Sequence, residues 1–180
     1  MGDVKEATKV RLLSQLRARI INELFVDQWM EVWFFPQWGG VRGWKGTQDI
    51  IFVGLNPSSG RFPSLADRLF YEQLRSNRFE NAHLTDMIKV RAVGGMVGQM
   101  LGDAALMKQQ RVYLLEEIDI IQPRLIVPMG RRTAAILGEW VPNRSEICPI
   151  RHYSPRIPSA QNFGKFSAEL DGVGARYGGA

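Results

Sequence analysis

Residues 50–54, Ile-Ile-Phe-Val-Gly, form a short run of apolar side chains that ends in a glycine. A run of this length and composition is typical of a strand that is buried on both faces, as in a parallel sheet covered by helices. A polar loop, residues 55–60, follows at once. The sequence therefore predicts a central strand that presents this loop at its carboxyl end, where α/β proteins bind their ligands.

Three further strands of the same sheet are predicted later in the sequence. Apolar runs predict strands at residues 82–88, 125–129 and 147–151, and helical spacing predicts helices at 65–75, 104–121 and 131–137. Strands that alternate with helices imply a parallel sheet covered on both faces. We therefore predict the α/β class, as a three-layer α/β/α fold with a central, mainly parallel four-stranded sheet.

The two ends of the chain are expected to lie outside this sheet. Apolar residues from Val10 to Phe25 recur at helical spacing and predict an amphipathic helix over about residues 4–26. The last residues, about 172–180, are rich in glycine and are predicted to fray. A chain of 180 residues suits one compact domain, so residues 1–180 are predicted to form a single domain.

Tryptophans gather between the N-terminal helix and the first predicted strand, in a stretch that Pro36 and two glycines interrupt. They are Trp29, Trp33, Trp38 and Trp44. Packing in the core is the favoured interpretation, because large aromatic side chains dominate protein cores. A platform on which single-stranded DNA stacks is the alternative.

Cysteine content and hydropathy exclude several classes of protein. Cys148 is the only cysteine, so an intramolecular disulfide is impossible and the thiolates are too few for an iron–sulfur cluster or a cysteine-ligated zinc site. No metal and no cofactor are predicted. The sequence has neither a membrane-spanning apolar stretch nor a signal-peptide pattern, so we expect a cytoplasmic monomer without a membrane partner, associated with the nucleoid in a bacterium or archaeon.

The charge of the chain favours a polyanionic partner. Its formal net charge is +5 and its pI is about 9.7. Much of the excess lies in residues 121–156, which contain six arginines and two glutamates. We predict that one edge of the fold follows DNA phosphates, although Arg124 and Arg144 are interpreted as ordinary solvated side chains.

The loop that follows the first strand is the first motif with chemical content, Gly54-Leu55-Asn56-Pro57-Ser58-Ser59-Gly60. Glycine permits a close approach of the backbone, proline stiffens the turn, and Asn56 offers an amide that can hold a water molecule. The loop is not a phosphate-binding P-loop, because no lysine followed by serine or threonine comes after Gly60. Taken alone, the loop is better explained as a structural turn that Asn56 caps.

The second motif follows the last predicted strand, His152-Tyr153-Ser154-Pro155-Arg156. An imidazole can stabilise a developing negative charge, a hydroxyl can contact phosphate, and an arginine beside a proline can probe a groove of DNA. A lone histidine more often satisfies a local hydrogen bond. Because the same loop also supplies the hydroxyl of Ser154 and the guanidinium of Arg156, a functional role is favoured for it.

These two motifs, in this order, resemble the uracil-DNA glycosylase superfamily from about Ile50 to Phe166. The first is similar to the Gly-X-Asn-Pro loop of the mismatch-specific and single-strand-selective monofunctional branches, and the second to the His-Pro-Ser-Pro-Arg loop of the single-strand-selective branch. The resemblance implies that Asn56 orients the attacking water and that His152 stabilises the leaving base. It also implies that Ser154 grips backbone phosphate and that Arg156 enters the base stack as a wedge, with Ser59 and Pro155 also at the DNA.

A third segment, from Phe62 to Phe70, resembles the part of the mismatch-specific branch that carries the aromatic stacked on the flipped base. We choose Phe62 for that platform. Phe70 is the alternative, although we favour a core position for it. With Gly54, Leu55, Pro57 and Ser58, Phe62 completes the predicted wall of the base-binding site.

The chain departs from the family pattern at two positions. Tyr153 replaces the usual proline, and Asp86 stands where an asparagine commonly reads uracil. An ionised aspartate offers only acceptors and would repel O4 of uracil. Three explanations stay open: Asp86 is protonated, it points elsewhere and holds loop amides or pairs with Lys89, or the substrate is another base with an exocyclic amine.

The resemblance implies a monofunctional glycosylase that hydrolyses the bond between a flipped base, uracil in the first instance, and deoxyribose in single-stranded or lesion-containing DNA. Two alternatives have a different function: a catalytically silent DNA-binding module of the same fold, and a glycosylase for another deaminated or methylated base. An amino-methyltransferase, whose motif begins Asn-Pro or Asp-Pro, is disfavoured because Ser58-Ser59 lacks the second proline and the aromatic of that motif.

Overall fold

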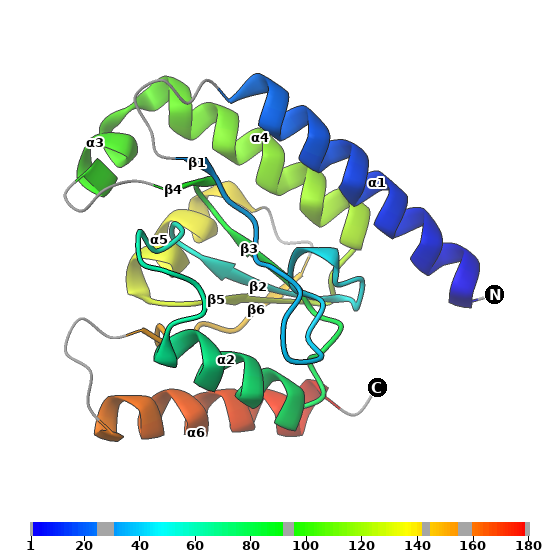
Figure 1. The fold of residues 1–180 in the computed structure, drawn as a ribbon, viewed down its shortest axis with the longest axis vertical. Coiled ribbons are helices and arrows are strands. Elements are labelled where there is room, and N and C mark those ends of the chain that lie inside the picture. Colours follow the sequence, from blue (N-terminus) through cyan, green and yellow to red (C-terminus); the bar gives the residue numbers. More distant parts are fainter. Residues whose placement is uncertain (1, 25–30, 92–95, 142–144, 155–159, 179–180) are drawn as a thin grey trace.

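The computed structural model describes residues 2–24, 31–91, 96–141, 145–154 and 160–178. At its centre is a parallel four-stranded sheet with the order β3-β2-β5-β6. The strands are β2 (Ile50–Gly54), β3 (His83–Asp86), β5 (Leu125–Pro128) and β6 (Glu146–Ile147). All residues of β2, β3 and β5 are buried, as the apolar runs predict. The predicted three-layer fold is confirmed, with helices on both faces of the sheet (Figure 1).

The last strand is shorter than predicted. β6 ends at Ile147, and the predicted strand at 147–151 continues only as an isolated bridge between Met129 and Ile150. Pro149 lies between these two points of pairing. The N–H groups of Cys148 and Ile150 still donate to Ile126 and Pro128 of β5, so Pro149 occupies a position whose N–H would point away from β5, which an edge strand tolerates.

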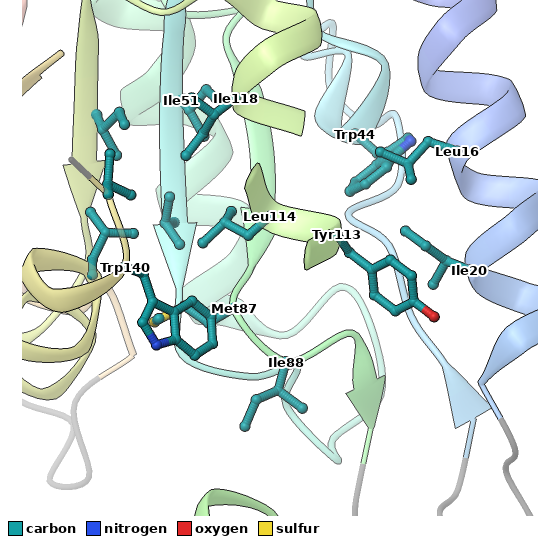
Figure 2. Close-up of a cluster of buried hydrophobic side chains, with 14 of the residues drawn as sticks. Leu16, Ile20, Trp44, Ile51, Met87, Ile88, Tyr113, Leu114, Ile118 and Trp140 are labelled. Atoms are coloured by element: carbon teal, nitrogen blue, oxygen red, sulfur yellow. The ribbon is translucent and has the colours of Figure 1, made fainter. Parts of the chain in front are cut away.

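One face of the sheet is covered by α1 (Gly2–Glu23), α4 (Ala104–Ile121) and α5 (Arg131–Trp140). Ile51 and Val53 of β2 point to this face, where they pack with Leu114 and Ile118 of α4. Figure 2 shows this cluster, with Tyr113 between α4 and the Ile20 side of α1. The predicted boundaries of α4 are confirmed at both ends.

The other face is covered by α2 (Leu65–Ser76) and α6 (Ala160–Tyr177), which lie side by side (Figure 1). Ile50 and Phe52 of β2 alternate along the strand with Ile51 and Val53. They pack on this face with Phe70 and Phe166. The alternation follows from the strand period of two. Phe70 is fully buried, so its predicted core position is confirmed.

The predicted frayed tail is wrong for residues 172–177, which belong to α6. Phe166, Leu170 and Val173 lie on one buried face of that helix. Gly174 permits a close contact, because a Cβ built there would lie 2.1 Å from Oδ1 of Asn77 at the end of α2. Gly174 therefore serves the packing of α6 against the end of α2. At the other end, α1 begins at Gly2 and ends at Glu23, while residues 25 and 26 of the predicted helix lie outside the described residues.

Four small elements of the described chain are not predicted from the sequence. β1 (Glu31–Val32) pairs antiparallel with β4 (Val90–Arg91). A 3-10 turn, η1 (Gly43–Lys45), places Trp44 in the core, which confirms the favoured interpretation for this tryptophan. Helix α3 (Met96–Gly102) precedes α4. None of the described helices has the length and apolar character to cross a membrane.

Candidate active site

Loops at the carboxyl ends of β2 and β3, with the loop after β6, surround a cavity of about 460 Å³. Most of the predicted site residues line it: Leu55, Asn56, Pro57, Ser58, Ser59, Phe62, Asp86, His152 and Ser154. Gly54 lies beneath this cavity instead of in its wall. Pro155 and Arg156 lie outside the described residues. The parallel topology thus brings together motifs that are far apart in the sequence.

Asn56 is held in a fixed orientation by its own loop. Its Nδ2 donates a hydrogen bond to the carbonyl of Pro57 at 2.9 Å. This contact distinguishes the two ends of the amide and leaves Oδ1 as an acceptor. No other hydrogen bond of the Asn56 side chain occurs among the described residues, so Oδ1 can accept a hydrogen bond from a water molecule in the cavity.

His152 is neutral near pH 7 and carries its proton on Nε2. The main-chain N–H of Ser154 lies 3.0 Å from Nδ1, and because an N–H only donates, Nδ1 accepts. The Ser154 carbonyl, 3.2 Å from the same nitrogen, fits only the other tautomer, and we assign the ring from the shorter contact. Burial lowers the pKa of His152 below its ordinary value, against smaller opposing effects of the Ser154 carbonyl and Asp67. The ring therefore offers Nε2–H as a donor at the cavity.

Tyr153, one of the two departures from the family pattern, supports the ring of His152. The two rings are stacked, with centroids 4.7 Å apart and planes at 18°. On its other side Tyr153 stacks on Phe70 at 4.3 Å and 8°. Its hydroxyl donates to Oδ1 of Asp67 at 3.2 Å. Asp67 also accepts from the Ser64 N–H at 2.8 Å within a capping box, so the start of α2 is tied to the histidine loop.

Phe62 forms an aromatic wall of the cavity. Its ring is half-buried and has three aromatic neighbours, Trp33 at 5.9 Å, Trp38 at 6.5 Å and Tyr71 at 5.7 Å between centroids. Rings at these separations and tilts attract one another and limit one another's movement. Phe62 is therefore a supported, partly exposed π-face inside the cavity.

The carboxyl group of Asp86 lies at the end of β3, directly over Gly54. These two residues are register partners in β2 and β3. A Cβ on Gly54 would lie 2.1 Å from Oδ1 of Asp86, so only glycine leaves space for this carboxyl group. Asp86 is 5% exposed and lines the cavity. The explanation that it points elsewhere is therefore wrong.

The two loops and the sheet that holds them fall within one match to a known family. The model of that family, the uracil DNA glycosylase superfamily, matches residues 43–171. The chain belongs to this superfamily. None of the curated proteins compared with it matches the sequence. Membership supports a DNA glycosylase of base excision repair, with DNA as its partner.

Two cavity residues of this superfamily member, Trp33 and Phe35, precede the matched range. Trp33 lies under the guanidinium of Arg91, whose Cζ is 3.7 Å from the ring centroid. Arg91 also lines the cavity and pairs with Glu31 at 2.8 Å. The contact of Arg91 with Trp33 was not predicted from the sequence. It depends on the antiparallel pairing of β1 with β4, which are some sixty positions apart, and the sequence of neither strand indicates this pairing.

Behind Asp86 lies a buried polar network that sequence reasoning also missed. The amino group of Lys89 forms an ion pair with Glu117 of α4 at 2.7 Å and donates to Oγ1 of Thr85 at 2.7 Å. It also donates to the main-chain carbonyl of Asp86. Glu117 contacts Nε2 of His83 at 3.1 Å. The suggested pairing of Lys89 with the Asp86 carboxylate is therefore wrong: the cation is committed to Glu117.

Among the described residues, no group of three or more histidine, cysteine, aspartate or glutamate side chains is placed to hold a metal ion. The chemistry that the cavity offers comes from an oriented amide, a neutral imidazole donor, a buried carboxyl group and an aromatic face. These groups suit the positioning of water and the stabilisation of a leaving group.

Proposed function

We propose that the protein is a monofunctional DNA glycosylase that hydrolyses the bond between a flipped uracil and its deoxyribose and leaves an abasic site. The observation that carries the proposal is that Asn56 and His152 line one cavity with Phe62. Family membership supplies the reaction class. The motifs around Asn56 and His152 support a place near the single-strand-selective and mismatch-specific branches.

The reaction needs the base outside the duplex, because its glycosidic bond is inaccessible within the stack. The cavity volume of about 460 Å³ accommodates a pyrimidine base. In this proposal the base stacks on Phe62, and the sugar lies toward the exposed Ser59 and Ser154 at the rim. Arg156, outside the described residues, takes the place of the flipped base in the stack.

Cleavage builds positive charge on the sugar and negative charge on the departing base. His152 stabilises the base by donating from Nε2–H, which a neutral ring does without a change of protonation. Asn56 holds water through Oδ1 and directs it to the sugar. An amide is a weak base, but orientation suffices for attack on an electrophilic oxocarbenium-like centre.

The first test is a cleavage assay on oligonucleotides that each carry one lesion, read as strand breaks after alkaline treatment. We expect cleavage at uracil and no adduct on borohydride reduction, because no lysine is placed as a nucleophile in the cavity wall of the described residues. Cleavage only at a different base would refute the substrate. DNA binding without cleavage of any base would instead identify a silent binding module.

Replacement of Asn56 separates chemistry from binding. Asn56→Ala removes the water-orienting oxygen but leaves the aromatic wall intact, so we expect cleavage to fall about a hundred-fold or more while DNA affinity changes little. Single-turnover rates and equilibrium binding to uracil DNA measure the two effects. Equal losses of rate and affinity would contradict the assigned role.

A further inference from the structure

Asp86 is a buried carboxyl group that lines the cavity. Among the described residues, neither of its carboxyl oxygens forms a hydrogen bond or an ion pair. The nearest amino group, that of Lys89, is bound to Glu117, Thr85 and the main-chain carbonyl of Asp86. Because this carboxyl group lines the cavity, a molecule that enters the cavity can form the hydrogen bonds that the described residues do not supply.

The second nearby cation is also engaged elsewhere. Arg91 stacks on Trp33 and pairs with Glu31, and its guanidinium therefore does not neutralise Asp86 by direct contact. The carboxyl group is fixed in place by close packing over Gly54. The cavity thus has a polar wall whose hydrogen bonds remain to be made by the molecule that enters it.

We propose that Asp86 recognises uracil as a neutral carboxylic acid, with its hydroxyl donating to O4 and its carbonyl oxygen accepting from N3–H. This inference rests on the proposed function and specifies how its substrate is bound. A protonated carboxyl group offers one donor and one acceptor side by side, which is the pattern of the amide that it replaces. An ionised carboxylate offers two acceptors and repels O4.

The surroundings of Asp86 favour its neutral form. Burial raises the pKa of Asp86 to about 7, with Glu117 and Asp67 acting in the same direction and Lys89 and Arg91 opposing them. Tyr71 and Tyr153 also interact electrostatically with Asp86, and burial raises the pKa values of both so far that both stay neutral. Burial lowers the pKa of His152, which moves its titration to lower pH.

The test is a pH profile of single-turnover cleavage on a single-stranded uracil oligonucleotide, with Asp86→Asn as the matched variant. The amide has the same shape and hydrogen-bonding pattern but does not titrate. For the wild-type protein we expect a loss of about 30-fold between pH 6 and pH 8.5, since only the protonated fraction is active. Asp86→Asn is expected to give a flat profile and to exceed the wild type at pH 8.5.

Each other outcome overturns the inference. Profiles that fall in parallel would assign the titration to another group, and a wild-type rate that rises with pH would make Asp86 a base instead. A flat wild-type profile would show that Asp86 does not select by protonation, with the glycosylase function intact. Absence of uracil cleavage by both proteins at every pH, with thermal unfolding unchanged, would remove the proposed function itself.

Discussion

At the scale of single residues, the departures from the family pattern are explained by their neighbours. Tyr153 fills the position of a proline, yet it joins His152 to the core through two stacked contacts. Proline stiffens a loop by fixing its backbone, whereas Tyr153 stiffens the loop by packing. The identity of this residue is visible in the sequence, but its stacking partner Phe70 is more than eighty positions away, so its role is not.

Two substitutions of Tyr153 separate its ring from its hydroxyl. Tyr153→Phe keeps the stack and loses the hydrogen bond to Asp67, so we expect cleavage within a few-fold of wild type. Tyr153→Leu removes the stacked support of His152, and we expect kcat to fall about ten-fold or more with little change in KM. Steady-state kinetics on uracil DNA measures both. A higher KM with an unchanged kcat for Tyr153→Leu would refute a positioning role.

At the scale of elements, α4 is joined to β3 by buried charges as well as by apolar packing. Glu117 is fully buried, and its pKa is lowered because the Lys89 charge and the His83 contact outweigh the desolvation that raises it. The stability that this carboxylate contributes is therefore present above its unfolded-state pKa and lost as pH falls through its lower folded value. The helical spacing of residues 104–121 predicts the helix but does not predict this network.

The network gives a matched test with two adjacent glutamates. Glu117→Gln leaves the buried Lys89 charge uncompensated, and we expect a loss of about 3 kcal/mol in the free energy of unfolding. Glu116→Gln breaks only a surface pair with Arg19 and is expected to cost less than about 1 kcal/mol. Urea denaturation at pH 7 measures both. Similar losses for the two variants would show that the buried pair contributes no more than a surface one.

Helix α6 offers a second comparison, between two of its own glycines. Gly174→Ala would place a Cβ 2.1 Å from Oδ1 of Asn77, so we expect destabilisation by about 1 to 3 kcal/mol. Gly172→Ala meets no atom within 4 Å and is expected to stabilise by about 0.5 to 1 kcal/mol, because alanine is the better helix former. Thermal unfolding measures the two shifts. A stabilising Gly174→Ala would contradict the close packing of α6 on α2.

At the scale of the whole molecule, the parallel sheet was predictable because buried strands are apolar along their whole length, and the site was predictable because it follows their carboxyl ends. Gly54 to Phe62 and His152 to Ser154 meet there for that reason. The elements that were not predicted depend on contacts with distant residues. β1 pairs with β4, and α6 packs through Gly174 against Asn77 at the end of α2. Local patterns carry no record of such contacts.

The parallel direction of the strands also places Arg131 and Arg132 at the opposite end of the sheet from Arg124. Arg131 and Arg132 are exposed in the first turn of α5, after the carboxyl end of β5. Their helix begins beside the histidine loop, since a Cβ on Gly130 would lie 3.7 Å from Cβ of His152. Arg124 lies at the amino end of β5, where it pairs with Asp49. Arg131 and Arg132 therefore lie on the side of the sheet that carries the histidine loop, and Arg124 lies on the opposite side.

This separation predicts how the molecule lies on DNA. Combined replacement Arg131→Ser and Arg132→Ser is expected to weaken DNA binding and to lower the slope of log affinity against log salt by about 1 to 2, one phosphate contact for each arginine. Arg124→Ser removes a like charge from the opposite edge of the sheet and is expected to leave that slope unchanged. Binding to uracil DNA across a salt series measures both slopes. If Arg124→Ser lowers the slope by about half as much as the double replacement, net charge alone governs binding; if only the α5 variant lowers it, DNA lies across the carboxyl edge of the sheet, where the cavity opens.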